Sequence, residues 1–191
     1  MSNRDRERWE SKHAEPRSAP PRESPGWITA AGATGIALDI AAGQGRHTRL
    51  LADAGLDVVA VDISRNALGR ISAAGNIRWG TQGRGRVMPI QADLDYWPFG
   101  HSVFDVVIQV DFLSRALFPE IRHAVRPGGF VLVDTFRRGE SARGRGLAPS
   151  NPEFLLRPGE LDREFDGWEV IRRSITDEPA PREAMLVRRP L

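Results

Sequence analysis

Short apolar runs alternate with amphipathic segments along most of the chain, from residue 36 onward. The apolar runs have the length and β-branched composition of buried strands, and the segments between them space their apolar residues as helices do. Strands are expected over residues 36–40, 58–63, 87–90, 104–110 and 130–135. Helices are expected over residues 46–54, 65–74 and 119–125, and a turn over residues 126–129. This alternation predicts an α/β fold, a Rossmann-like doubly wound sheet that is largely parallel and carries helices on both faces.

The C-terminal part of the chain departs from this alternation. A short helix is expected over residues 159–165. Residues 168–175 and 184–189 then read as two strands, and the link between them is too short to hold a helix. Two consecutive strands without a crossover helix predict an antiparallel hairpin at the end of the sheet.

The N-terminal part is polar. A short helix is expected over residues 5–13, and prolines make residues 15–25 irregular. We therefore expect a polar arm over residues 1–26 and a single domain over residues 27–191. An arm of this kind either covers a cofactor pocket or forms a loose tail, and both interpretations stay open at this point.

The densest chemical signal is the turn that follows the first predicted strand. Gly43 and Gly45 allow backbone N–H groups to approach a ligand, and the helix that follows offers unpaired N–H groups to an anion. Thr48 stands where a third glycine would complete the dinucleotide fingerprint, so the turn suits a ligand without a pyrophosphate. The alternative is an ordinary strand-to-helix turn.

Three acids follow or end neighbouring strands in register with this turn. Asp39 lies near the end of the first predicted strand, Asp62 ends the second, and Asp93 follows the third. The carboxyl ends of parallel strands share one edge of the sheet, where ligands bind. Asp62 is placed to accept hydrogen bonds from ribose hydroxyls, Asp93 from an adenine amine, and Asp39 either holds a cation or orders the turn. The alternatives are a helix cap for Asp62 and a turn residue for Asp93.

These residues resemble the motifs of the class I S-adenosylmethionine-dependent methyltransferases. The matching stretches are residues 38–45, 61–62, 92–94, 104–107 and 126–130. The resemblance implies a sheet of seven strands, with the last strand antiparallel and inserted beside the fifth. It implies S-adenosyl-L-methionine as the cofactor. The residues that it implies for cofactor binding are Asp39, Ala41, Gly43, Gly45, Asp62, Ile63, Asp93, Leu94 and Gln109. Ala41 stands where the family usually has glycine, and its side chain leaves less space for the methionine part of the cofactor.

A narrower resemblance is to the small methyltransferases of the tellurite-resistance type. It rests on Gly45-Arg46-His47 and on the stretches at residues 151–161 and 167–169. Members of that group typically act on small molecules. Some of them carry a His-Arg pair after the sixth strand, where this chain has Pro181-Arg182, so any role of that histidine is lost or moved.

The function that follows is methyl transfer to a small-molecule acceptor by in-line displacement. The sulfonium of the cofactor activates the methyl group, so the protein mainly binds, aligns and excludes water, and no catalytic base is assigned. The residues expected beside the acceptor are His47, Asp111, Phe112 and Arg115. Two alternatives remain, an RNA methyltransferase and a non-catalytic protein that binds S-adenosylmethionine.

Composition narrows the partners. The 191 residues contain no cysteine and no apolar run of membrane-spanning length, so we expect a cytoplasmic protein without disulfides or thiolate metal sites. The scattered histidines do not predict a metal site. The formal net charge is only +2, which does not by itself predict a nucleic-acid partner. The basic stretch from Arg137 to Arg145 either attracts an anionic acceptor or is a solvated loop. The oligomeric state is left open.

Overall fold

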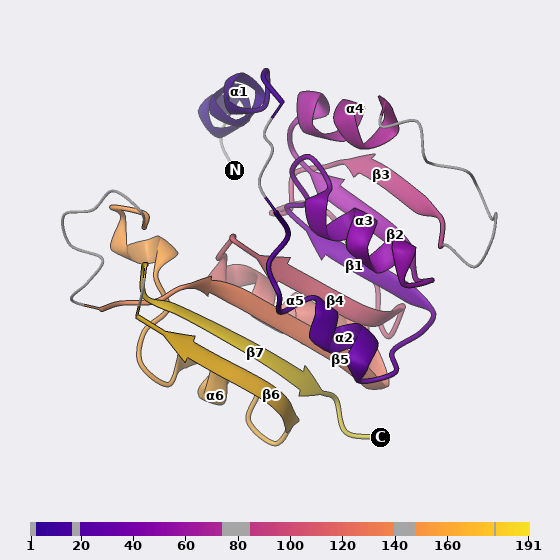
Figure 1. Ribbon diagram of the computed structural model, residues 1–191, viewed down its shortest axis with the longest axis vertical. Coiled ribbons are helices and arrows are strands. Elements are labelled where there is room, and N and C mark those ends of the chain that lie inside the picture. Colours follow the sequence, from indigo (N-terminus) through magenta and orange to yellow (C-terminus); the bar gives the residue numbers. More distant parts are fainter. Residues whose placement is uncertain (1–2, 17–19, 74–84, 140–147, 178) are drawn as a thin grey trace.

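A single seven-stranded sheet organises the chain in the computed structural model, which describes residues 3–16, 20–73, 85–139, 148–177 and 179–191 (Figure 1). The strands lie in the order β3-β2-β1-β4-β5-β7-β6. Their bounds are β1 Ile36–Ile40, β2 Asp57–Asp62, β3 Val87–Gln91, β4 Phe104–Val110, β5 Val125–Phe136, β6 Glu169–Thr176 and β7 Arg182–Arg188. The seven strands predicted from the apolar runs are therefore all present.

Strand direction brings one residue from the end of the chain to the ligand edge. Strands β1 to β5 pair in parallel, whereas β7 is antiparallel to both β5 and β6. This confirms the sheet that the family resemblance implies. Because β7 runs backwards, its first residue, Arg182, pairs with Phe136 at the carboxyl end of β5. Arg182 thus lies on the edge where the parallel strands end.

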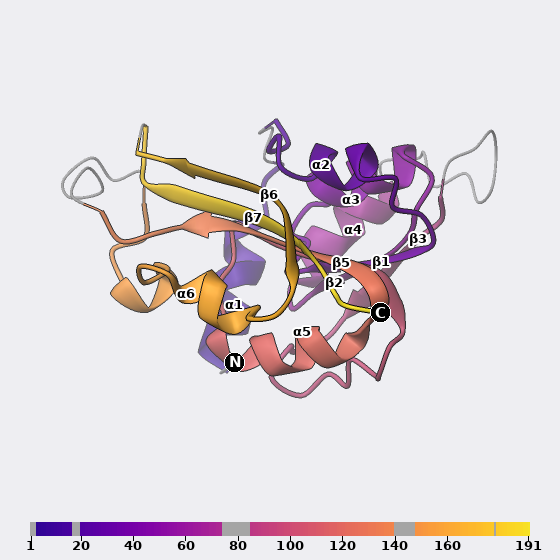
Figure 2. The ribbon, with the colours of Figure 1, turned by 90° about the horizontal axis from the view of Figure 1, so that it is seen from below.

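Helices cover both faces of the sheet. Figure 2 shows α2, α3 and α4 on one face, and α5 and α6 on the other. The bounds are α1 Asn3–Lys12, α2 Gly26–Ala30, α3 Arg46–Asp53, α4 Arg65–Ala73, α5 Phe118–Ala124 and α6 Glu160–Glu164, with 3-10 turns at Arg115–Leu117 and Pro152–Phe154. No helix in the described part of the chain is long and apolar enough to span a membrane.

Two buried clusters hold these layers together, one on each side of the sheet. Leu38, Ile40 and Val107 face α5, whose Phe118 and Ile121 are fully buried. The other face packs against α2, α3 and α4 through the residues Ile28, Leu51, Leu68, Ile71, Val58, Val106 and Ile108. Residues of one strand alternate between the two clusters, as the twofold period of a strand requires. The continuous apolar runs in the sequence reflect strands buried on both faces.

The turn expected at residues 126–129 is instead part of a strand, and that prediction was wrong. Strand β5 already begins at Val125, which pairs with Phe104, and the next pair joins Val106 to Phe130. The extra residues bulge out of the ladder, with Gly128 at a φ of 76°. Arg126 anchors the bulge because its guanidinium donates to both carboxylate oxygens of Asp105, at 2.9 and 2.8 Å. A bulge satisfies the same proline and glycine pattern as a turn.

Candidate active site

The glycine turn between β1 and α3 has the backbone that its sequence predicts. Gly43 and Gly45 have φ angles of 54° and 77°, in the left-handed region that favours glycine. A Cβ on Gly45 would lie 2.6 Å from Cγ1 of Ile71, so α4 also requires a glycine here. Ala41, at a φ of 57°, adopts the same region with a side chain. The glycine usual in the family at this position is thus the residue that the backbone favours.

Asp39 orders this turn from beneath. Its side chain is 2% exposed and accepts a hydrogen bond of 2.6 Å from the hydroxyl of Thr48 on α3. The pKa of Asp39 is raised to about 7, mainly by burial; the hydrogen bond from Thr48 opposes this rise, and the charge of the neighbouring Asp62 adds to it. Of the two roles expected for Asp39, the structure supports ordering the turn.

Asp62 ties the turn to β2. Its Oδ2 accepts the backbone N–H of Gly43 at 2.8 Å, and its Oδ1 accepts the N–H of Ser64 at 2.8 Å. Each carboxylate oxygen keeps a second lone pair for a further donor. Asp93 follows β3 on the same edge, and its Oδ1 accepts the N–H of Asp95 at 3.1 Å, as a turn residue does. Ile63 and Leu94, which follow these acids, are buried.

Gln109 places an amide without hydrogen-bond partners in the described structure at the same edge of the sheet. It is fully buried near the end of β4, in register with Ile40 of β1. Among the described residues, neither its Nε2 nor its Oε1 has a hydrogen-bond partner. A buried amide without partners carries a desolvation cost of about 1–3 kcal/mol, which a polar ligand removes. Gln109 therefore fits a site whose polar ligand completes its hydrogen bonds.

The N-terminal arm crosses the glycine turn. In Figure 1 the chain leaves α1 and passes over the carboxyl ends of β1 and β4 before it enters α2. A Cβ added at Gly43 would lie 3.3 Å from Cε1 of His13, so this arm residue covers the turn. The side chain of Gln44 donates to the carbonyl oxygen of Glu15 at 2.8 Å. The described part of the arm therefore packs against the glycine turn.

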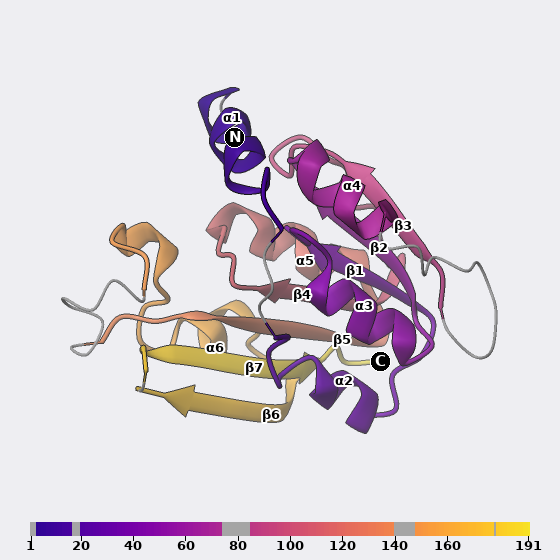
Figure 3. The same ribbon diagram turned by 45° about the horizontal axis from the view of Figure 1, so that its top comes forward.

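Helix α1 is held against α4, and Figure 3 shows the two side by side. The carboxylate of Glu10 accepts the first N–H groups of α4, from Arg65 at 2.8 Å and Asn66 at 2.9 Å, and the hydroxyl of Ser64 at 2.8 Å. Burial opposes ionisation of Glu10, but these hydrogen bonds outweigh it and hold its pKa below the usual range. A carboxylate from a distant segment thus caps the helix that follows Asp62.

Three arginines surround Asp111 on the other half of the edge. We call Arg22, Arg46 and Arg182 the arginine cluster; they come from the arm, the first turn of α3 and the start of β7. Arg22 and Arg182 approach Oδ1 of Asp111 at 3.0 and 2.8 Å, and Arg46 pairs with Oδ2. Burial opposes ionisation of Asp111, but Arg182, Arg22 and Arg46 together hold its pKa below the ordinary value. Asp111 is therefore a carboxylate at neutral pH.

Arg182 is the most fixed member of the arginine cluster. Its Nη2 donates to Oδ1 of Asp134 at 2.6 Å, and its guanidinium lies 4.4 Å from the ring centroid of Phe136. Asp134 in turn accepts the hydroxyl of Ser24, which is buried in the arm. In the part of the chain that the structure describes, Nη1 of Arg182 is buried and has no hydrogen-bond partner.

His47 lies beside the arginine cluster as a neutral ring. It is buried on α3, and its Nε2 accepts the backbone N–H of Arg22 at 3.2 Å. The pKa of His47 is lowered to about 4, mainly by burial and next by the charge of Arg46. Because a backbone N–H can only donate, Nε2 is the acceptor and the ring carries its proton on Nδ1.

Other residues expected near the acceptor lie differently. The guanidinium of Arg115 binds Glu160 at 2.6 Å and the carbonyl oxygens of Glu153 and Leu155, so it fastens the segment before α6. Phe112 is half-buried and packs against the cluster on the α5 face. The structure thus brings His47 and Asp111 together and gives Arg115 a structural role.

The predicted basic stretch is described only at its start. Arg137 pairs with Asp177 at 2.5 Å, and Arg138 is exposed. Residues 140–147, with Arg143 and Arg145, lie outside the described part. Within the described residues no group of three or more potential ligands is placed to hold a metal ion.

Sequence reasoning missed Arg22, Asp134 and Ser24 as site residues, and it noted Arg182 only as the residue beside the missing histidine of a family His-Arg pair. Arg22 and Ser24 lie in a proline-rich arm that carries no periodic pattern. A usable signal existed for Arg182, because an antiparallel last strand beside the fifth must start at the ligand edge.

Comparison with known proteins agrees with this geometry. Residues 37–129 match the family model described as "Methyltransferase domain". A demethylmenaquinone methyltransferase from Renibacterium salmoninarum is 34% identical over 105 residues, which span 52% of this chain and 40% of that protein. The match therefore covers less than half of that relative's length.

Solved structures share the fold at low identity. TehB from Haemophilus influenzae superposes with a TM-score of 0.73 at 17% identity, covering 90% of this chain and 63% of that chain. The 1,6-didemethyltoxoflavin-N1-methyltransferase of Burkholderia thailandensis, solved with 1,6-didemethyltoxoflavin and S-adenosylhomocysteine, gives 0.67 at 18% identity, covering 89% and 78%. The likeness to TehB confirms the resemblance to the tellurite-resistance type at the level of the fold. Residues 37–129 thus match a methyltransferase domain, and the whole sheet shares the fold of solved methyltransferases.

Proposed function

We propose that the protein binds S-adenosyl-L-methionine and transfers its methyl group to a small-molecule acceptor by in-line displacement. The observation that carries the proposal is the buried, unpartnered amide of Gln109 beside the strained glycine turn in the described structure. An amide in that position offers two donors and an acceptor to a polar ligand on the edge of the sheet. The bound cofactor supplies a sulfonium that is both methyl donor and leaving group.

The residues of the chain have binding roles in this proposal. The free lone pairs of Asp62 accept ribose hydroxyls, and the glycine turn and the start of α3 present backbone N–H groups to the methionine end. Asp93 and Leu94 border the adenine. The arm, through His13, covers the turn and keeps water out of the site.

A small-molecule acceptor is supported by three observations. The arm lies against the rim of the site, where His47 and Gln44 bind it. The names of the relative from Renibacterium and of the structural neighbour from Burkholderia refer to small molecules. Many described arginines are paired with carboxylates, as in Arg86–Asp57 and Arg122–Glu164, rather than arranged as a free basic stripe.

The test is transfer of label from S-adenosylmethionine carrying a tritiated methyl group. The purified chain is incubated with this donor and a panel of phenols, thiols, amines, quinols and total RNA. We expect label to appear in one class of small molecule and S-adenosylhomocysteine to accumulate in the same amount. Label that enters only RNA contradicts the acceptor class, and label that never leaves a bound cofactor contradicts the methyl transfer.

A further inference from the structure

We infer that the arginine cluster, Arg22, Arg46 and Arg182 around Asp111, is the subsite that binds an oxyanion group of the methyl acceptor. The ligand chemistry is a carboxylate or a phosphate on a small molecule. The inference rests on the proposed function, which it deepens by assigning a charge to the acceptor. It is carried by the charge balance, by an unused donor and by the place of the cluster in the sheet.

The charge balance favours an anion. Three guanidiniums meet two carboxylates, those of Asp111 and Asp134. The nearby His47 is neutral and adds no charge that would change this balance. The site therefore keeps an excess positive charge at an edge of the sheet that is only partly exposed, where electrostatic attraction is stronger than in water.

Arg182 supplies a donor that is already in position. Its side chain is 12% exposed, and Asp134 and the ring of Phe136 fix the plane of its guanidinium. Among the described residues its buried Nη1 has no hydrogen-bond partner. Guanidinium groups bind carboxylates and phosphates through paired N–H donors, and a fixed guanidinium loses little entropy on binding. An oxyanion at this point gains a hydrogen bond that the free protein lacks.

The position of the arginine cluster favours the acceptor over the cofactor. Most groups assigned to the cofactor lie at the ends of β1, β2 and β3, with Gln109 near the end of β4, whereas Asp111 follows β4 and Asp134 and Arg182 lie at the ends of β5 and β7. Neighbouring strands are about 4.8 Å apart, so β7 lies about 14 Å from β1. Arg46, at the start of α3, lies between the cofactor side and the acceptor side of this edge. An anion held at Arg182 therefore lies on the acceptor side of the site.

The arm takes part in this subsite. Arg22 belongs to the arm, and its guanidinium also binds Asp111 through Nε, at 3.3 Å. Its side chain is 38% exposed, whereas that of Arg182 is 12% exposed, so Arg22 is the member that faces solvent. The arginine cluster is complete only when the arm is in place. Binding of an anion is therefore coupled to closure of the arm, and protection of the arm reports binding without any measurement of turnover.

The experiment uses the full-length chain saturated with S-adenosylhomocysteine. Benzoate and inorganic phosphate are the anionic probes, benzamide is the neutral partner of benzoate, and chloride keeps the ionic strength constant. Isothermal titration measures affinity, and limited trypsin digestion measures cleavage of the arm. We expect benzoate or phosphate to bind saturably, benzamide to bind at least about tenfold more weakly, and the bound anion to slow arm cleavage.

Variants link this binding to the arginine cluster. Arg182→Met should lower the affinity for the anion at least about tenfold. Arg182→Lys should restore part of this affinity, because lysine keeps the positive charge but lacks the paired N–H donors of the guanidinium. Arg138→Met, at an exposed arginine outside the cluster, is the matched control and should bind as the natural chain does. The inference is overturned if neither anion binds better than chloride, or if Arg182→Met leaves anion affinity unchanged.

A second comparison separates the acceptor from the cofactor. S-adenosylhomocysteine has a methionine-derived carboxylate, and methylthioadenosine lacks it. If Arg182→Met lowers the affinity for S-adenosylhomocysteine but not for methylthioadenosine, the arginine cluster binds the cofactor carboxylate. The assignment to the acceptor is then wrong. If the natural chain binds benzoate but neither adenosyl compound, the proposed function fails while the anion site stands.

Discussion

The backbone N–H of Arg22 donates a hydrogen bond of 3.2 Å to Nε2 of His47, joining the arm to α3 across 25 residues of sequence. This bond occupies the lone pair with which a neutral imidazole would accept a proton. While the arm is closed, His47 therefore cannot act as a general base. Its first role is to hold the arm over the site, which places Arg22 beside Asp111.

Replacing His47 tests this hold on the arm. In His47→Phe the N–H of Arg22 loses its acceptor, and the arm should open more often. We expect amide exchange at Arg22 to accelerate by about tenfold, corresponding to about 1.4 kcal/mol, while exchange in β4 and β5 stays unchanged. His101→Phe, at an exposed histidine, serves as the control. Unchanged exchange at Arg22 would show that the hydrogen bond does not hold the arm.

The buried Asp39 predicts an unusual dependence of stability on pH. Its folded pKa of about 7 lies above the ordinary value of 3.8, so the native state binds a proton that the unfolded state releases. The free energy of unfolding should therefore fall as pH rises from about 4 to 7 and then level off. Asp39→Asn keeps an acceptor for Thr48 and removes the charge. Denaturant titrations without cofactor should give Asp39→Asn a free energy of unfolding up to about 4 kcal/mol higher than that of the natural chain at pH 8. This difference should disappear near pH 4.

His47 predicts the opposite dependence over nearly the same range. Its folded pKa of about 4 lies below the ordinary value of 6.5, so the unfolded state binds the proton first and stability falls as pH drops from 6.5 to 4. The two groups oppose each other in the natural chain. Asp39→Asn should therefore reveal a loss of stability on acidification that the natural chain partly masks. An Asp39→Asn variant that keeps the pH profile of the natural chain would contradict the raised pKa of Asp39.

Ala41 predicts a stabilising substitution. An L-residue in the left-handed region costs about 1–2 kcal/mol, and Ala41 adopts it at a φ of 57°. Ala41→Gly removes that strain but makes the unfolded chain more flexible, so we expect a net gain of about 0.5–1 kcal/mol in the free energy of unfolding. Ala42→Gly, in the same turn without a positive φ, should destabilise and is the control. Equal losses in both variants would show that Ala41 is unstrained.

Gln109 predicts opposite effects on stability and binding. Gln109→Leu replaces an unpartnered buried amide by an apolar side chain of similar size, which should stabilise the free protein by about 1–2 kcal/mol. The same change removes hydrogen bonds to the ligand, so affinity for S-adenosylhomocysteine should fall about tenfold or more. Thermal unfolding and isothermal titration measure the two effects. If both decrease together, Gln109 is a structural residue whose partner belongs to the fold.

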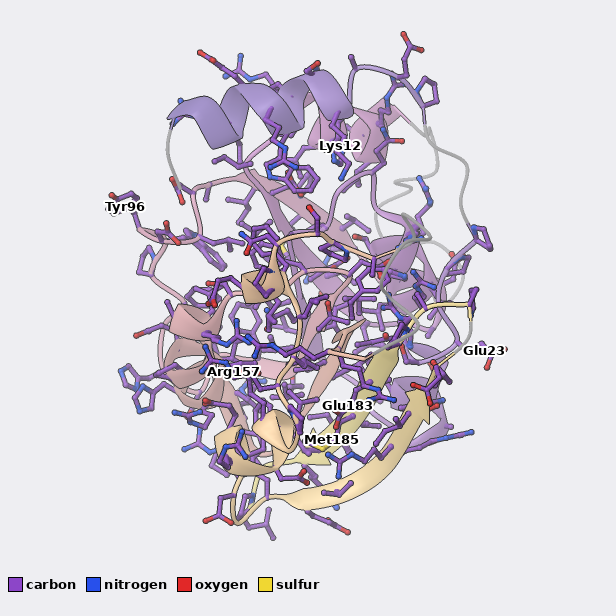
Figure 4. All side chains as sticks on the ribbon, turned by 90° about the vertical axis from the view of Figure 1, so that its left-hand side faces the viewer. Lys12, Glu23, Tyr96, Arg157, Glu183 and Met185 are labelled. Carbon is purple, nitrogen blue, oxygen red and sulfur yellow. The ribbon has the colours of Figure 1, made fainter. Side chains whose placement is uncertain are left out.

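The fold was predictable because its strands are buried on both faces and their apolar runs are continuous. Asp39 and Asp62 were predictable because each lies within a few residues of a strand end. The bulge at residues 126–129 was missed since its proline and glycines fit a turn equally well. Tyr96, three residues after Asp93, is 83% exposed and points away from the molecule (Figure 4), so proximity in sequence to an acid of the site does not place a residue in it.

The acceptor half of the site was predictable only in part, because its contacts join distant segments. Arg22 and Asp111 are separated by 89 residues, and Ser24 and Asp134 by 110. Arg115 carries the same charge as Arg182 but is bound by Glu160 instead, and only the packing of α6 decides this. Composition shows how many arginines a chain has, whereas the pairing of each one follows from tertiary structure.

The central claim is that the edge built by the glycine turn, Asp62 and Gln109 binds S-adenosylmethionine. Isothermal titration of the natural chain with S-adenosylhomocysteine, beside a titration with NAD, tests it most directly. We predict saturable binding of one S-adenosylhomocysteine per chain and no saturable heat with NAD, since Thr48 replaces the third glycine of the dinucleotide fingerprint. An absence of binding at millimolar S-adenosylhomocysteine, or tighter binding of NAD, would contradict the account.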